Sequence, residues 1–158
     1  MLQLVNVGQK SLADYATIAT RGLMEEIRRL AEPLRGKRLV HVSATAFGGG
    51  VAEINYALVP LMRDAGLDAE WRIIAGAEEF FAVTKEVHNG LQGAHIEWTH
   101  EMRRTYLERV LDNSLLLDDG WDYIVVHDPQ PAAILEYVSS NRSEFQNAHW
   151  IWRCHIDL

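Results

Sequence analysis

The chain has 158 residues, of which 48% are hydrophobic and 23% are charged, and its formal net charge is −7. Its length fits a single globular domain, 1–158, and its acidic balance disfavours a nonspecific nucleic-acid surface, which needs basic side chains. No membrane-spanning apolar run or signal-peptide pattern occurs, and the single cysteine, Cys154, excludes an intrachain disulfide, so we expect a cytoplasmic protein.

Apolar spacing and turn residues divide the chain into strands and helices in alternation. A short strand is predicted at 2–7, and a long helix is predicted to begin at Ser11 and end near Leu34. Buried strands are indicated at 38–43 and 121–127, and further strands at 68–75 and 148–154. Further helices are predicted at 51–65, 78–89, 101–117 and 131–139, the last with Pro131 in its first turn.

The order of these elements predicts the fold class. Strands alternate with helices, and several strands are continuous apolar runs rather than alternating patterns. Both features are typical of a parallel sheet that is covered by helices on its two faces. We therefore predict an α/β domain with a Rossmann-like parallel sheet, in which loops at the carboxyl ends of strands carry the ligand contacts.

A glycine-rich loop lies between the strand at 38–43 and the following helix. Gly48, Gly49 and Gly50 let the backbone approach a ligand closely, and the helix N-terminus offers free N–H groups to a diphosphate or sugar hydroxyl. Glu53 follows in the first turn of the helix. A tight turn without a ligand explains the glycines equally well. The run matches neither the dinucleotide fingerprint nor a P-loop.

Polar residues follow two later strands. His127, Asp128 and Gln130 come directly after the strand at 121–127, where Asp128 can bind sugar hydroxyls or act as a base. An Asp-Pro turn is the alternative. After the last strand, Arg153 can face a phosphate and His155 a sugar hydroxyl or developing charge, although an ordinary polar loop is also compatible.

The helix at 78–89 has an aromatic pair among polar groups, which resembles a carbohydrate-contacting surface. Lys85, His88 and Asn89 follow that pair, and we expect one of the two phenylalanines to be in the core. His41 lies inside an apolar strand and is expected to be a core histidine. No zinc-binding spacing is found among the histidines, so no metal site is predicted.

Residues 42–53, VSATAFGGGVAE, closely resemble the glycine loop of the nucleotide-sugar-dependent trehalose synthases. These are retaining glycosyltransferases of the GT-B fold, related to the GT-B trehalose phosphorylases. Three further stretches agree in order and spacing, namely LVPLM at 58–62, EFFAVTK at 79–85 with the histidine and asparagine at 88–89, and IWRCHID at 151–157. The resemblance extends over essentially the whole chain.

The resemblance implies two Rossmann-like domains facing each other across a cleft. The N-terminal domain shapes the acceptor glucose site, and the C-terminal domain binds the nucleotide of ADP-glucose or UDP-glucose. Only the first domain is represented in 1–158, so the donor-binding domain is expected to be missing and the chain to be inactive alone. No metal or other cofactor is implied, because NDP-glucose is a co-substrate.

Residue roles are carried over from the resemblance in the same way. His155 and Asp128 are the implied catalytic residues, and Gly49 and Gly50 would lie beside the diphosphate. The full set of candidate substrate- or diphosphate-binding residues is Gly48, Gly49, Gly50, Glu53, Lys85, His88, Asn89, His127, Gln130, Arg153 and Asp157. Three alternatives stay open: a stand-alone sugar- or phosphate-binding module, a self-associating dimer, and half of a trehalose phosphorylase. Neither nucleic acid nor membrane is expected as a partner.

Overall fold

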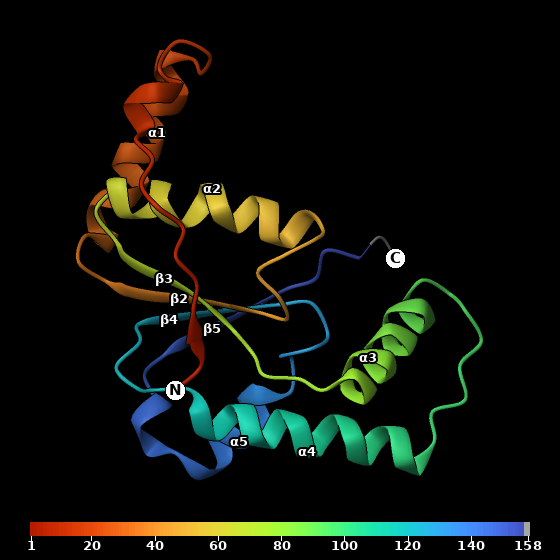
Figure 1. The fold of residues 1–158 in the computed structure, drawn as a ribbon. Helices are drawn as coiled ribbons and strands as arrows, with labels where there is room; N and C mark the ends of the chain where they lie inside the picture. Colours follow the sequence, from red (N-terminus) through yellow and green to blue (C-terminus); the bar gives the residue numbers. More distant parts are fainter. Residues whose placement is uncertain (157–158) are drawn as a thin grey trace.

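A computed structural model describes residues 1–156 of the chain (Figure 1). Five strands form one sheet, and they are β1 (Gln3–Leu4), β2 (Arg38–Ser43), β3 (Asp68–Ile73), β4 (Tyr123–His127) and β5 (His149–Arg153). The α-helices are α1 (Arg21–Ala31), α2 (Gly50–Asp64), α3 (Glu78–Leu91), α4 (His100–Leu116) and α5 (Ile134–Asn141). Three short 3₁₀ helices are η1 (Leu12–Tyr15), η2 (Glu32–Leu34) and η3 (Ser143–Phe145).

The sheet has the strand order β1-β3-β2-β4-β5. Strands β3, β2, β4 and β5 are mutually parallel, whereas β1 pairs with β3 in the antiparallel direction, so the sheet is mixed. The predicted α/β, Rossmann-like fold class is confirmed, with this short antiparallel edge strand as the one departure from an all-parallel sheet. Such edge strands are common additions to parallel sheets.

Helices cover both faces of the sheet, which explains why its central strands are apolar throughout. On one face, α4 and α5 bury Val110, Ile134 and Val138 against alternate residues of β2 and β4, including Val40 and Val42. On the other face, α2 packs against the opposite set of alternate residues (Figure 1). Those residues are Leu39, Ala69, Trp71 and Val125, covered by Ala52 and Val59 of α2.

The predicted long N-terminal helix is wrong as a single element. Ser11 caps only the short helix η1, accepting a hydrogen bond from the N–H of Ala13, and the regular helix α1 begins later. Thr20 has an extended backbone and its hydroxyl accepts from the N–H of Leu23, so it caps a new helix and divides the segment. The last predicted helix likewise begins later, at Ile134, because Pro131 lies in the preceding turn.

The topology fixes where a ligand can bind. From β2 the chain passes through α2 to β3 on one side, whereas β4 lies on the other side of β2. The strand order therefore changes direction between β2 and β4, and loops leaving the carboxyl ends of these two strands diverge. In open α/β sheets, ligands bind in the crevice at this switch point.

Candidate functional site

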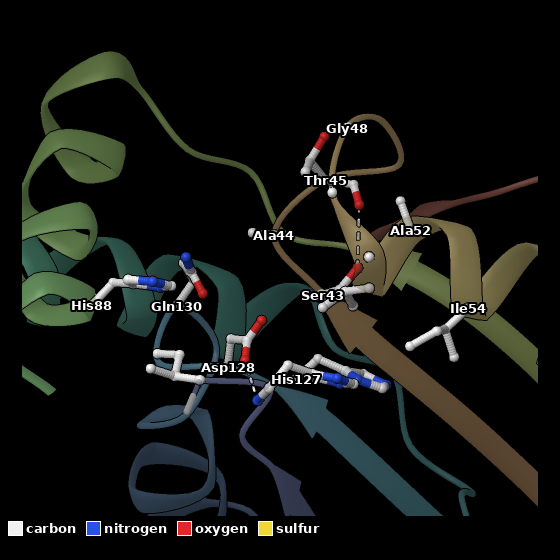
Figure 2. A pocket seen from close by; sticks show the side chains of 15 residues that line it. Ser43, Ala44, Thr45, Gly48, Ala52, Ile54, His88, His127, Asp128 and Gln130 are labelled. Atoms are coloured by element: carbon white, nitrogen blue, oxygen red, sulfur yellow. Dashed lines mark hydrogen bonds between the residues drawn. The ribbon is translucent and has the colours of Figure 1, made fainter. Parts of the chain in front are cut away.

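A pocket of about 570 Å³ lies at the carboxyl ends of β2 and β4, at the switch point of the sheet. Figure 2 shows the loop after β2, with Thr45 and Gly48, on one side and Asp128 and His127 on the other. His88 reaches the pocket from α3. The lining residues are Ser43, Ala44, Thr45, Gly48, Gly49, Gly50, Val51, Ala52, Ile54, His88, His127, Asp128, Gln130, His155 and Ile156.

The glycine loop needs glycine for its backbone shape. Gly48 has a φ of 67°, and Gly49 has a φ of 90° and a ψ of 160°. Residues with a Cβ rarely adopt these backbone conformations. Gly49 is the N-cap of α2 and provides no side-chain cap. The first backbone hydrogen bond of the helix joins the N–H of Glu53 to the Gly49 carbonyl at 3.4 Å. The preceding N–H groups have no intrahelical partner, which is the arrangement by which helix N-termini bind anions in general.

Side chains before the glycines fix the path of the loop. The hydroxyl of Ser43, at the end of β2, accepts a 2.7 Å hydrogen bond from the indole N–H of buried Trp71 and donates to the Thr45 carbonyl. The Thr45 hydroxyl accepts from the N–H of Phe47 and donates to its carbonyl. The glycines are thereby connected to the core through two short-range turns.

Asp128 occupies the turn after β4 with a left-handed backbone, φ 64°, the only such residue other than glycine within 1–156. Its carboxylate accepts a 2.7 Å hydrogen bond from the backbone N–H of His155 through Oδ1. Its own N–H donates to the Arg153 carbonyl, and its carbonyl accepts from the indole of Trp152. Asp128 therefore joins the loops after β4 and β5, and its Oδ2 has no hydrogen-bond partner within 1–156.

Three histidines form a continuous row that runs from the pocket lining into the core, here called the histidine row. Nδ1 of His41 lies 2.8 Å from Nε2 of His127, and Nδ1 of His127 lies 2.9 Å from Nε2 of His155. The rings stack, with centroids 5.1 Å and 5.2 Å apart. At the inner end, Nε2 of His41 lies 3.4 Å from Sδ of Met62 in α2.

Burial keeps the inner two rings neutral. His41 is 2% exposed and His127 is 1% exposed. Desolvation, and secondarily the positive charge of Arg153, lowers the pKa of His41 to about 4. Desolvation lowers the pKa of His127 to about 3, with further contributions from His41, His155 and Arg153. Both rings are therefore uncharged at neutral pH, each with one N–H donor and one acceptor nitrogen.

A family model described as "Trehalose synthase, N-terminal domain" matches residues 41–158. The chain belongs to this family. The matched range contains the whole pocket, from Ser43 to Ile156, and all three members of the histidine row.

Relatives with curated names agree with the family. The chain is 54% identical to a trehalose synthase of Rubrobacter xylanophilus over 99% of this chain and 38% of that protein. It is 46% identical to a trehalose synthase of Pyrococcus horikoshii over 96% of this chain and 35% of that protein. A trehalose phosphorylase of Pleurotus pulmonarius is 27% identical over 93% of this chain and 21% of that protein. The chain thus spans little more than a third of the synthases it matches.

The pocket of this trehalose synthase N-terminal domain collects most, but not all, of the residues predicted from sequence. Eight of them line it, namely Gly48, Gly49, Gly50, His88, His127, Asp128, Gln130 and His155. Glu53, Lys85, Asn89 and Arg153 do not line it; Glu53, Lys85 and Arg153 are exposed and Asn89 is half-buried. Asp157 lies outside the described residues. The side-chain Oε1 of Gln130 is buried and has no hydrogen-bond partner within 1–156.

Sequence reasoning missed several pocket residues. Ser43, Thr45 and Ile54 line the pocket, although the prediction selected only the three glycines and Glu53 from their segment. His41 was correctly expected to be a core histidine, but its bond to His127 was not anticipated. The available signal is that His127 ends a buried strand and that His155 follows the last strand by two residues.

The aromatic pair of α3 is divided between the core and the surface. Phe80 is 1% exposed and Phe81 is 37% exposed, which confirms that one ring of the aromatic pair is in the core. Within 1–156, no group of three or more His, Cys, Asp or Glu side chains is arranged to hold a metal ion. None of the helices in the same range combines the length and apolar character of a membrane-crossing helix.

Proposed function

We propose that this domain forms the acceptor side of a retaining glycosyltransferase that makes trehalose from NDP-glucose and glucose. The observation that carries the proposal is the meeting of three elements in one pocket: free N–H groups at the start of α2, the polar turn after β4, and His155 after β5. An anion-binding backbone beside side chains that bind hydroxyls suits a substrate with a phosphate and a sugar. Membership of the family named for trehalose synthase supports trehalose as the product.

The pocket suggests a division of roles. The N–H groups after Gly49 would face the diphosphate, where a helix N-terminus favours negative charge. Asp128 Oδ2 and the unpartnered Oε1 of Gln130 would accept hydrogen bonds from glucose hydroxyls. His155, at the outer end of the histidine row, would contact the sugar at the reacting end.

The proposed reaction is a substitution at the anomeric carbon of the donor glucose. The bond from this carbon to the β-phosphate oxygen breaks, and a bond to the anomeric hydroxyl oxygen of the acceptor forms on the same face. The acceptor's proton passes to the leaving diphosphate. The products are α,α-1,1-linked trehalose and a nucleoside diphosphate, and no metal is assigned a role.

A phosphorylase is the second candidate, because fungal trehalose phosphorylases are also relatives of this chain. In that case free phosphate would occupy the anion position beside α2. The identity of 54% to a synthase against 27% to a phosphorylase favours the synthase.

Ligand titration followed by NMR tests the proposal on the 158-residue chain. We expect glucose to bind weakly and to shift resonances of Asp128 and Gln130, and ADP, UDP and phosphate to bind more weakly still. Asp128→Asn should reduce glucose affinity, whereas Asp119→Asn, at an exposed site away from the pocket, should not. Submicromolar nucleotide binding would contradict the assignment of the donor nucleotide to another domain.

An activity assay separates the remaining alternatives. We expect the chain alone, incubated with glucose and ADP-glucose or UDP-glucose, to form no trehalose. Ordinary turnover by the isolated chain would refute the division into two domains. Size-exclusion chromatography distinguishes a monomer from a self-associating dimer.

A further inference from the structure

The direction of the hydrogen bonds in the histidine row depends on where each ring carries its proton. A neutral imidazole has one N–H and one acceptor nitrogen. Both links join an Nδ1 to an Nε2, from His41 to His127 and from His127 to His155. Only two arrangements satisfy both links: every ring is protonated on Nε2, or every ring is protonated on Nδ1.

The inner end of the row selects between these two arrangements. Nε2 of His41 lies 3.4 Å from the sulfur of Met62, which has no hydrogen and can only accept. An Nε2–H on His41 therefore has a weak acceptor, whereas a bare Nε2 would face sulfur lone pairs and remain an unsatisfied buried acceptor. His41 is buried, so solvent offers no substitute partner. The Nε2–H form is favoured in all three rings.

We propose that His41 and His127 are positioning residues that hold His155 in its Nε2–H tautomer, so that His155 presents Nδ1 as an acceptor for a sugar hydroxyl. His155 lines the pocket, and within 1–156 its Nε2 is bonded to His127 while Nδ1 has no partner. The sugar hydroxyl rests on the proposed function, but the tautomer follows from the histidine row alone. Figure 2 shows His127 on the far side of the pocket from Thr45 and Gly48.

The row is an orienting device and not a proton wire. A proton taken up at Nδ1 of His155 would have to move inward along the row to His41, and the next atom is the Met62 sulfur, which passes no proton on. The lowered pKa values of His41 and His127 also oppose charge on the inner rings. The row therefore fixes a tautomer, as partners of functional histidines commonly do.

Imidazole ¹⁵N NMR of the 158-residue chain tests the tautomer without any ligand, because protonated and bare ring nitrogens have well-separated shifts. We expect the three Nε2 shifts of the row to be those of N–H nitrogens and the three Nδ1 shifts to be those of bare nitrogens. His127→Phe should leave the His155 nitrogens at averaged shifts, since the acceptor for its Nε2–H is lost. His95→Gln, at an exposed site, is the matched control.

Met62→Leu is the second variant, for use if His127→Phe fails to fold. It keeps the volume of the core nearly unchanged. It removes the sulfur acceptor, so both bond directions become populated and the His155 shifts move towards the average. Averaged His155 shifts in the unmutated chain, or shifts that no folded variant moves, would overturn the proposal.

Glucose titration of the same samples separates this inference from the proposed function. Loss of one oriented hydrogen bond predicts about three- to tenfold weaker glucose binding in His127→Phe. Fixed tautomers in a chain that binds no sugar would refute the proposed ligand and leave the positioning role standing. Sugar binding with averaged tautomers would refute the positioning role and leave the proposed ligand standing.

Discussion

Acidification between pH 6.5 and 5 should destabilise the domain strongly, because two buried histidines must stay neutral in the folded state. The folded pKa values of His41 and His127 are about 4 and about 3, below the value of about 6.5 expected in an unfolded chain. Across this window the unfolded chain therefore binds more protons than the folded chain, from about one more at pH 6.5 to about two more at pH 5. Stability must rise with pH here and fall as pH is lowered.

The size of the effect follows from linkage. Each proton contributes about 1.36 kcal/mol per pH unit, so the slope approaches about 2.7 kcal/mol per unit near pH 5. Integrated from pH 6.5 to pH 5, the two histidines lower the free energy of unfolding by about 3 kcal/mol. That is a large share of the 5–15 kcal/mol, roughly, by which domains are stable.

Urea unfolding followed by tryptophan fluorescence at several pH values measures this slope directly. The window lies above the range in which carboxylates such as Asp122 and Glu144 titrate, since their pKa values are lowered by Lys37 and by backbone and Arg142 contacts respectively. His127→Phe should reduce the slope by about half, to roughly 1.4 kcal/mol per unit.

Exposed His95 supplies the control for this experiment, and His95→Gln should leave the slope unchanged. A slope near zero in the unmutated chain would refute the claim that both inner rings are held neutral. A slope lowered equally by both variants would show that the titrating groups are not those of the histidine row.

Two further predictions concern the loops after β3 and β2. Asn113, fully buried, donates to the Ala75 carbonyl and accepts from the Ala75 N–H, so Asn113→Ala should cost about 2–4 kcal/mol in urea unfolding. Exposed Asn141→Ala should change stability by less than about 0.5 kcal/mol. Gly49→Ala should cost about 1–3 kcal/mol, because its φ of 90° is strained for alanine, whereas Gly50→Ala, at an ordinary φ, should cost much less; equal losses of stability in the two variants would refute the backbone argument.

The sequence predicts the architecture because its signals are local. Apolar runs and Gly or Pro ends place β2, β3, β4 and β5 and all the helices after α1 within a few residues. The division at Thr20 was missed, since apolar residues continue at helical spacing through it and only the backbone shows that the chain is extended there. At such a position a capping residue begins a new helix although the helical spacing of apolar residues continues, and the spacing alone does not reveal this.

The histidine row depends on strand register, which the sequence does not specify. His41 pairs with Val125 of β4, and His127 lies two residues after Val125. His127 pairs with Arg153, the last residue of β5, and His155 lies two residues after Arg153. Residues two apart point to the same face, which brings the rings into a diagonal row. A slip of one residue would turn one ring to the other face. The glycine loop, by contrast, was recognisable because its neighbours are adjacent in sequence.

The charges around the pocket support the proposal that this domain binds the sugar and not the nucleotide. No lysine or arginine lines the pocket within 1–156, and the whole chain carries a net charge of −7. The N-terminus of α2 is then the main group that would attract a diphosphate. A helix terminus contributes about 0.3–2 kcal/mol to the binding free energy of a charged group. That is worth at most about a thirtyfold gain in affinity. Asp128, Gln130 and His155 instead provide directed acceptors for hydroxyls, so glucose should bind this chain more tightly than ADP or UDP.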